Sequence, residues 1–337
     1  MTTRQRLLVL LVVVLVVATG STAYALAALR HSRALGARVP SVPTATGAVL
    51  SGPRLVFRHT GLDQDYGVVA EVPLGDPDGP RTFTGVSCDR VYATADAASC
   101  LRTRRGVVTT FQQVDLDAGW KQVGEAGLPG IPSRTRLSPD GTLSASTSFV
   151  TGHSYMTTGF STATEIHRVG GSSYGDLERF TLVVDGRRTT PTDRNIWGVT
   201  FAADDRTFYA TVATHGVTYL ARGDLTARTL TTIASKVECP SLSPDGTRIA
   251  FKERVHHAGG TWWTPAVLDL STMRRTVLSR ETRNVDDQIA WLDDDTLLYG
   301  LARSGEAGVT DIWSLDVSTT AKPQPYVEQA WSPAVIR

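Results

Sequence analysis

Two identical hexapeptides constrain the fold of this chain more than any other feature. Residues 137–142 and 242–247 both read Leu-Ser-Pro-Asp-Gly-Thr. In each copy proline fixes φ at the first turn position, aspartate can bond its own backbone, and glycine supplies a positive φ without steric cost. A turn signature that recurs in this way is typical of repeat folds. The structural turn residues that we predict are Pro139, Asp140, Gly141, Pro244, Asp245 and Gly246.

Short strand patterns recur at a regular period around these turns. Residues 238–242, 247–253, 264–270 and 274–278 predict four short strands, the second of which alternates apolar and polar side chains. An aspartate in the turn recurs at positions 204, 245 and 294, in steps of 41 and 49 residues. Four strands per repeat at a period of about 40 to 50 residues are what the blades of a β-propeller require.

The two ends of the chain are predicted to share one blade. Further four-stranded units are expected at residues 86–123, 134–191, 197–233 and 288–325, whereas only three strands precede them, at 55–59, 67–73 and 81–84. Residues 327–333 repeat the start of an innermost strand, so we expect this tail to complete the first blade and close a ring of six. Extra material at residues 152–162 and 170–179 is expected to form loops on one rim.

Residues 242–251, Leu-Ser-Pro-Asp-Gly-Thr-Arg-Ile-Ala-Phe, resemble the blade motif of TolB-like six-bladed propellers. Residues 137–142 match its first half, and the resemblance covers roughly residues 53–337. It implies an all-β fold class, a six-bladed β-propeller. The chain departs from TolB in lacking a separate amino-terminal α/β domain, since the 23 residues before the first strand are too few to form one. This departure argues against a role with the Tol and Pal envelope proteins.

The amino terminus predicts one helix that enters a membrane. Residues 7–29 contain no charged residue and are long enough to cross about 30 Å of hydrocarbon. Because Arg4 and Arg6 precede this stretch, we expect the amino end to stay in the cytoplasm and the rest to be exported.

A cleaved signal peptide is the alternative, because residues 25–27, Ala-Leu-Ala, fit a signal peptidase site. The propeller is then secreted rather than held at the cell membrane by a single span. The domains that we predict are a signal anchor or transmembrane helix at 1–30, a flexible linker at 31–52 and the propeller at 53–337.

The three cysteines fit an exported protein. Cys88 and Cys100 flank a hairpin pattern that places them on adjacent antiparallel strands, so we predict a disulfide between them. Cys239 is then left as a small buried hydrophobe.

The charge of the chain argues against a nucleic-acid partner. The net charge is +1, and the basic residues, nearly all arginine, form no stripe. We interpret the scattered arginines as a solvated surface and expect a monomer.

The sequence contains a hydrolase-like motif and several histidines, but we interpret them as parts of loops and strands rather than as catalytic residues. Residues 171–175 satisfy the G-x-S-x-G pattern of hydrolases, but a strand pattern follows at 180–184 where a nucleophile elbow needs a helix. His256 and His257 are expected at a solvated hairpin tip, since adjacent side chains on a strand point to opposite faces. His153, His167 and His215 fall in separate blades or loops.

Metal sites have little support in the sequence. Residues 293–295 are three aspartates without the alternating spacing of a calcium loop, so we expect a turn. Asn195 and Asn284 are the only asparagines, which leaves little room for the calcium site of propeller lactonases. We therefore predict no catalytic, cofactor-binding or metal-binding residues, and no cofactor.

These patterns favour a membrane-tethered, extracytoplasmic propeller that is not an enzyme and acts as a binding or scaffolding module. The partners expected are the membrane, through the amino-terminal helix, and an envelope protein, peptide or glycan. The alternative is an exported propeller enzyme, a hydrolase or lyase, with a site in the central channel. Three or more Asp, Glu, His or Asn side chains converging at the channel mouth favour the enzyme.

Overall fold

The computed structural model describes residues 2–36, 42–47, 50–150, 161–257, 260–317, 320 and 322–337. The chain divides into two compact units. One unit contains Met1–Val42 and Gly61–Tyr66, and the other contains Pro43–Thr60 and Gly67–Arg337.

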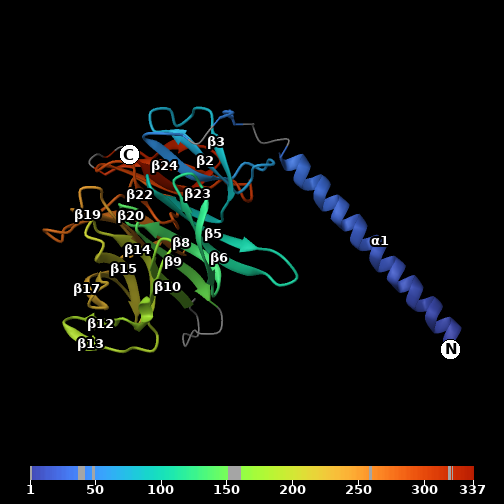
Figure 1. Ribbon diagram of the computed structural model, residues 1–337, viewed down its shortest axis with the longest axis horizontal. Coiled ribbons are helices and arrows are strands. Elements are labelled where there is room, and N and C mark those ends of the chain that lie inside the picture. Colours follow the sequence, from blue (N-terminus) through green and yellow to red (C-terminus); the bar gives the residue numbers. More distant parts are fainter. Residues whose placement is uncertain are drawn as a thin grey trace. The chain divides into compact units, whose positions relative to one another are not determined.

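The amino-terminal unit is built on one long helix, α1 (Thr3–Gly36), drawn in dark blue in Figure 1. Its segment Thr3–Arg30 is long and apolar enough to cross a membrane, a test that a signal sequence also passes. The helix continues for six residues beyond the predicted anchor, into the segment that we expected to be a linker. No proline interrupts the sequence before Pro40, so no residue in this stretch forces the helix to end at position 30.

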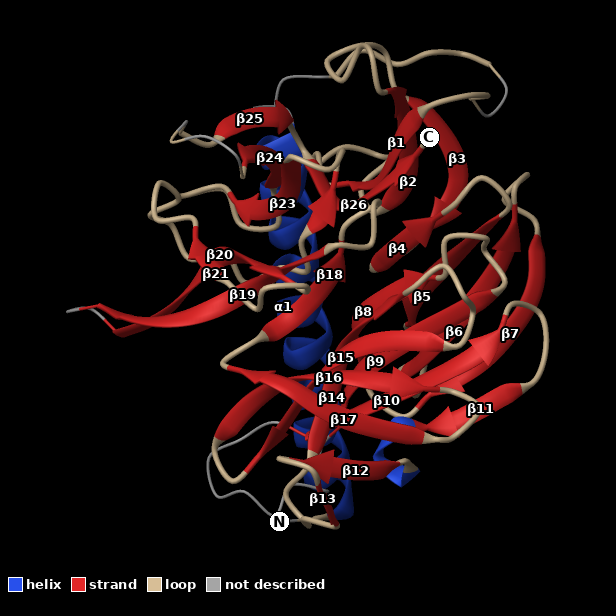
Figure 2. Cartoon of the chain, turned by 90° about the vertical axis from the view of Figure 1, so that its left-hand side faces the viewer, coloured by secondary structure: helices blue, strands red, loops and turns tan. Residues whose placement is uncertain are grey.

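The larger unit is a six-bladed β-propeller in which every blade has at least four strands (Figure 2). The predicted fold class is therefore confirmed. Three of the sheets have the strand orders β26-β1-β2-β3, β4-β5-β6-β7 and β8-β9-β10-β11. Their bounds are β26 (Ala330–Ile336), β1 (Arg54–His59), β2 (Val68–Pro73), β3 (Thr82–Ser87), β4 (Arg90–Ala93), β5 (Ala97–Arg104), β6 (Thr110–Asp117), β7 (Gln122–Leu128), β8 (Ile131–Leu137), β9 (Leu143–Val150), β10 (Ser161–Arg168) and β11 (Ser173–Asp176).

The other three sheets have the orders β13-β12-β17-β16-β15-β14, β18-β19-β20-β21 and β22-β23-β24-β25. A short 3₁₀ helix, η1 (Leu177–Arg179), follows β11. The bounds of these strands are β12 (Thr181–Val184), β13 (Arg187–Thr189), β14 (Asn195–Phe201), β15 (Thr207–Thr214), β16 (Val217–Asp224), β17 (Thr229–Ser235), β18 (Glu238–Leu242), β19 (Arg248–His257), β20 (Gly260–Asp269), β21 (Arg275–Val277), β22 (Ala290–Trp291), β23 (Thr296–Ala302), β24 (Thr310–Asp316) and β25 (Gln324–Val327).

The ring closes as the sequence predicts. The innermost strands β4, β8, β14, β18, β22 and β26 each contact the next, and β26 contacts β4. The carboxyl-terminal strand β26 pairs antiparallel with β1, with Arg58 opposite Trp331, so both ends of the propeller share one blade.

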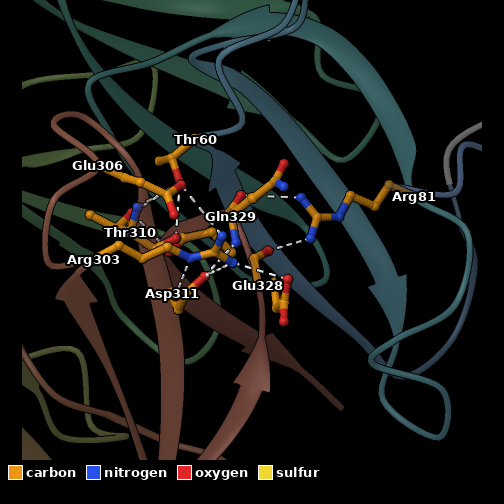
Figure 3. Close-up of polar contacts among 9 residues, drawn as sticks. Thr60, Arg81, Arg303, Glu306, Thr310, Asp311, Glu328 and Gln329 are labelled. Carbon is orange, nitrogen blue, oxygen red and sulfur yellow. Dashed lines mark hydrogen bonds and ion pairs between the residues drawn. The ribbon is translucent and has the colours of Figure 1, made fainter. Parts of the chain in front are cut away.

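Polar side chains reinforce this closure between the first and last blades (Figure 3). Arg81 donates hydrogen bonds to the main-chain carbonyls of Glu328 and Gln329. Arg303 holds Asp311 with two hydrogen bonds of 2.6 and 2.8 Å, and Asp311 accepts another from the Gln329 amide. The seam therefore has a dense set of hydrogen bonds in addition to the strand pairing.

Both copies of the hexapeptide form turns between the two innermost strands of a blade. In the first, the Asp140 carboxylate accepts from the Thr142 amide at 3.0 Å and Gly141 has a φ of 73°. In the second, Asp245 accepts from Thr247 at 3.0 Å and Gly246 has a φ of 72°. A positive φ is why glycine occupies this position.

The third blade differs from the sequence prediction in two respects. Residues 170–179 are not an inserted loop, because they contain β11, the outermost strand of that blade. Strand β12 does not belong to the same blade but runs parallel to β17 of the next one. Parallel pairing joins strands far apart in sequence, so no local pattern reveals it. Residues 152–160 of the other predicted insertion lie outside the described residues.

The predicted linker is also partly attached to the propeller. Thr44 forms a parallel bridge with Arg81, and the amide of Leu50 donates to the buried carboxylate of Glu71. The larger compact unit therefore includes residues from Pro43 onward, earlier than the predicted boundary at 53.

The apolar core lies between adjacent blades. One cluster joins Leu55 and Phe57 on β1 to Leu298 on β23 and Ile312 on β24, all fully buried. These residues come from strands whose two faces both pack against a neighbouring sheet, which favours continuous apolar runs.

Cys88 and Cys100 are joined by a disulfide, with Cα atoms 5.5 Å apart. Cys100 lies on β5, and Cys88 lies just before β4, the strand that pairs with β5. Cys239 is a free, buried thiol.

Candidate functional site

The innermost strands carry bulges that shape the central channel. The register of β14 shifts between Trp197 and Thr200, and that of β18 between Glu238 and Ser241. Within these bulges Gly198 and Cys239 have φ values of 66° and 51°. A bulge redirects the side chains beside it and increases the local twist of the strand.

The segment before β22 lies against the innermost strands and supplies two carboxylates, those of Asp286 and Asp287. The Asp286 carboxylate contacts Lys252 Nζ at 2.5 Å, and Asp287 contacts Arg90 at 3.0 Å. The Gln288 amide donates to the carbonyl of Val199 at 3.1 Å. The channel is therefore bridged by hydrogen bonds from one segment to several blades.

Positive charge exceeds negative charge around these ion pairs. The side chains that form the group are the cations Arg90, Arg134, Arg136 and Lys252 and the carboxylates Asp286 and Asp287. Burial, and then repulsion by Arg134, lower the pKa of the Arg90 guanidinium to about 10, although Asp287 attracts it. Burial opposes ionisation of Asp286, but Lys252 outweighs it and the pKa of that carboxyl is lowered. Both carboxylates contact a basic side chain, Asp286 that of Lys252 and Asp287 that of Arg90.

One cavity of about 430 Å³ opens where the innermost strands end. It is lined by residues from the carboxyl ends of all six innermost strands and from the turns that follow, including Tyr92, Arg136, Phe201, Pro244, Trp291 and Val335. All six strands can contribute because each is the innermost strand of its blade and the carboxyl ends of all six lie at this cavity. A volume of this size is within the range of about 300 to 1,000 Å³ that ligand pockets occupy.

Arg136 marks the inner limit of this cavity. It lines both the cavity and a void of about 20 Å³ deeper in the channel. Its Nη2 donates to the carbonyl of Ile289 at 3.0 Å, and its guanidinium lies 4.4 Å from the centre of the Tyr92 ring. Only 5% of the residue is exposed, and its Nε is buried without a hydrogen-bond partner. The cavity wall therefore combines aromatic and apolar surface with one buried cation.

The group of buried basic and acidic side chains around the channel was not predicted from the sequence. We interpreted the arginines as a solvated surface, and the structure contradicts this for Arg54, Arg81 and Arg136, which are buried. A usable signal was present, since Arg134 and Arg136 alternate on a strand that the turn motif identifies as innermost. Such a strand has a blade on each side, so charged side chains on it cannot all reach bulk solvent.

The residues that the sequence raised as catalytic candidates do not converge. Ser173 of the G-x-S-x-G pattern lies on β11, where its hydroxyl contacts the Glu165 carboxylate, and a strand rather than a helix carries the chain onward after η1. His167 contacts Asp115 at 2.8 Å between the second and third blades, and His215 lies beside Asp193. His153 and the side chain of His257 lie outside what the structure describes.

The candidate metal residues are likewise used locally. The amide oxygens of Asn195 and Asn284 accept hydrogen bonds from the main-chain amides of Thr162 and Trp263. Residues 293–295 form a turn, in which Asp293 accepts from the Asp295 amide at 2.9 Å. Among the described residues, no three His, Cys, Asp or Glu side chains are grouped so as to hold a metal ion.

Comparison with solved structures supports the fold. The chain is similar to TolB from Acinetobacter baumannii, with 16% identity, a TM-score of 0.56, and coverage of 89% of this chain and 68% of that one. It is also similar to a chain of the nidogen/laminin complex, with 9% identity, a TM-score of 0.53, and coverage of 84% and 98%. No protein-family model matches the sequence, and no curated protein matches it with significance.

The fold and the closing strand define the class of protein: a TolB-like six-bladed β-propeller preceded by one apolar helix. Structural similarity at such low sequence identity shows the fold alone. The activity therefore has to be argued from the residues of the site.

Proposed function

We propose that this protein is a membrane-tethered, extracytoplasmic propeller that binds a segment of an envelope protein in the cavity at the end of its channel, without catalysing a reaction. The apolar helix would serve as the tether, with Arg4 and Arg6 on the cytoplasmic side. The disulfide between Cys88 and Cys100 fits an oxidising compartment.

The main support for this proposal is the set of residues that line the cavity. Six blades contribute to one concave surface of about 430 Å³ that contains Tyr92, Phe201 and Trp291. Rigid aromatic walls beside polar side chains such as Thr200, Ser241 and Ser243 favour binding of a partly apolar segment. The neighbouring carboxylates, Asp286 and Asp287, are already paired with Lys252 and Arg90. Paired anions of this kind fix a structure rather than act as a general acid or base at neutral pH.

One structural neighbour belongs to a complex between two proteins, nidogen and laminin. This likeness concerns the fold alone, and it is compatible with a protein partner here.

A site-specific photocrosslinker tests the binding role. Benzoylphenylalanine placed at Ala95, which is exposed on the rim of the cavity, should give a discrete adduct in intact cells. The matched position is Arg187, which is exposed on β13 at the opposite edge of its sheet from the innermost strand. Adducts that are equal at both positions, or absent from Ala95, contradict the proposal.

Membrane attachment is tested separately. A protein that remains in the membrane after alkaline carbonate extraction and retains residues 2–36 by mass spectrometry has an uncleaved anchor. A soluble form that begins after residue 27 supports the cleaved signal peptide instead.

A further inference from the structure

Arg136 is the one buried cation of the channel group that lacks an acidic partner among the described residues. Arg90 and Lys252 each contact a carboxylate, and Arg134 lies 3.8 Å from Asp286. Arg136 has one hydrogen bond, to a carbonyl, and the ring of Tyr92. Its Nε has no hydrogen-bond partner and is itself buried, so a ligand in the cavity that Arg136 lines would contact the terminal nitrogens of the guanidinium.

A buried guanidinium without a counter-ion has a considerable desolvation cost. The ring of Tyr92 and one carbonyl offset part of it. An anion in the cavity could offset the rest, because a guanidinium presents several N–H groups in a fixed plane that matches a carboxylate or phosphate. The unused hydrogen-bonding capacity of Arg136 therefore points to an anionic ligand.

The surroundings favour a single negative charge. Asp245 lies on the rim of the same cavity, 3.9 Å from Arg248, and would repel a second charge on the ligand. Arg337 also lines the cavity and its charge offsets that of Asp245, so Arg136 leaves one net positive charge, which a carboxylate matches and a dianionic phosphate exceeds. The rest of the wall includes Leu137, Phe201, Leu242 and Val335, which suit apolar side chains next to the anion.

We propose that Arg136 binds the carboxylate of an apolar peptide segment that enters the cavity, supplied either by a chain terminus or by an Asp or Glu side chain. This inference rests on the proposed binding function and specifies the chemistry that the site recognises.

Three synthetic peptides and one inorganic anion test it by calorimetric titration of the full chain in detergent. The peptides are acetyl-Gly-Gly-Leu-Leu with a free carboxylate, the same peptide with a terminal amide, and acetyl-Gly-Asp-Leu-Leu-amide; the anion is phosphate. We expect the first or third peptide to bind about tenfold to a hundredfold more tightly than the neutral amide, the value of one charge-assisted hydrogen-bonded contact. Whichever of the two binds identifies the source of the carboxylate.

Arg136→Met and Arg136→Lys are the informative variants. Arg136→Met should bind the acidic and neutral peptides equally, and Arg136→Lys should recover only part of the difference because an ammonium cannot make the planar paired contact. The thermal midpoint of ligand-free Arg136→Met should stay close to that of the wild type, since losing the bond to the Ile289 carbonyl and the contact with Tyr92 is offset by removing a buried charge without an acidic partner. Arg90→Met is the contrast, because it leaves the buried Asp287 carboxylate without its cation and should lower the midpoint clearly.

Three results would overturn the inference. They are equal binding of acidic and neutral peptides by the wild type, no binding of either acidic peptide up to millimolar concentration, and tighter binding of phosphate than of both. If the adduct at Ala95 persists while the peptides fail, the binding function stands and only the assignment of Arg136 is wrong. Loss of the adduct as well removes the function itself.

Discussion

Arg81 donates a hydrogen bond from Nη1 to the main-chain carbonyl of Gln329 at 3.1 Å, across 248 positions of sequence. The same Nη1 lies 2.7 Å from Nδ1 of His59, which accepts because arginine has no acceptor atom. The guanidinium also packs over the ring of Phe57 at 5.0 Å. One side chain thus joins the beginning and the end of the propeller (Figure 3).

Replacing Arg81 should weaken the closed ring. Arg81→Met leaves the carbonyls of Glu328 and Gln329 without this donor at a buried seam, which should lower the free energy of unfolding by about 2 to 4 kcal/mol. Urea denaturation followed by circular dichroism measures the change. Arg206→Ala, which breaks an ion pair with Asp224 on the surface, is the control and should change the free energy of unfolding far less, because solvent screens an exposed pair. Similar losses for the two variants would show that Arg81 does not support the seam.

Removing the disulfide should cost a comparable amount. Cys88 and Cys100 are 12 positions apart, and closing a loop of this length in the unfolded chain corresponds to about 3 kcal/mol. We expect the double variant Cys88→Ala, Cys100→Ala to lose roughly that amount by denaturation. Dithiothreitol should destabilise the wild type and leave the double variant unchanged. A reductant effect of equal size on both proteins would contradict this explanation.

Two glycines with similar backbone angles should respond differently to alanine. A Cβ on Gly198 would lie 2.7 Å from the Cα of Cys239 on the neighbouring innermost strand, whereas one on Gly246 would meet nothing within 4 Å. Gly246→Ala should therefore cost only the left-handed backbone penalty of about 1 to 2 kcal/mol. Gly198→Ala adds a backbone clash and should cost about 1 to 3 kcal/mol more. Thermal midpoints of the two variants check the order, and equal shifts would exclude close packing of β14 against β18.

The carboxyl group of Glu178 should give the propeller a measurable pH dependence. Burial, and then the charge of Asp176, raise the pKa of Glu178 from 4.5 to about 7, and one oxygen is buried without a partner. Because the folded-state pKa lies above the unfolded one, the contribution of this group to stability is full below about pH 4.5 and is lost as the pH rises through about 7.

Glu178→Gln removes this titration. The thermal midpoint of the variant minus that of the wild type should increase from pH 5 to pH 8. The reason is that the neutral amide has no charge to bury. Comparing both proteins in the same buffers cancels the titration of every other group. An equal difference at the two pH values would mean that Glu178 is solvated and titrates normally.

Local sequence predicted the strands, the turns and the closed ring. The hexapeptide turns depend on proline, aspartate and glycine within six residues, and the closing strand at 330–336 repeats a pattern found at the start of other blades. The disulfide pair followed from a hairpin only twelve residues long. Each of these features is a short-range consequence of backbone preference and alternation.

The site depended on tertiary structure, because its parts are far apart in sequence. Arg136 lies on the third blade, Trp291 on the sixth and Tyr92 on the second, and only closure of the ring brings them around one cavity. The parallel pairing of β12 with β17 likewise joins segments that no local signal connects. Sequence alone therefore predicted a closed ring of six blades, since turn chemistry and strand alternation act over a few residues. The burial of Arg136 and its missing counter-ion were decided by the three-dimensional arrangement, because burial and charge pairing depend on which distant residues meet.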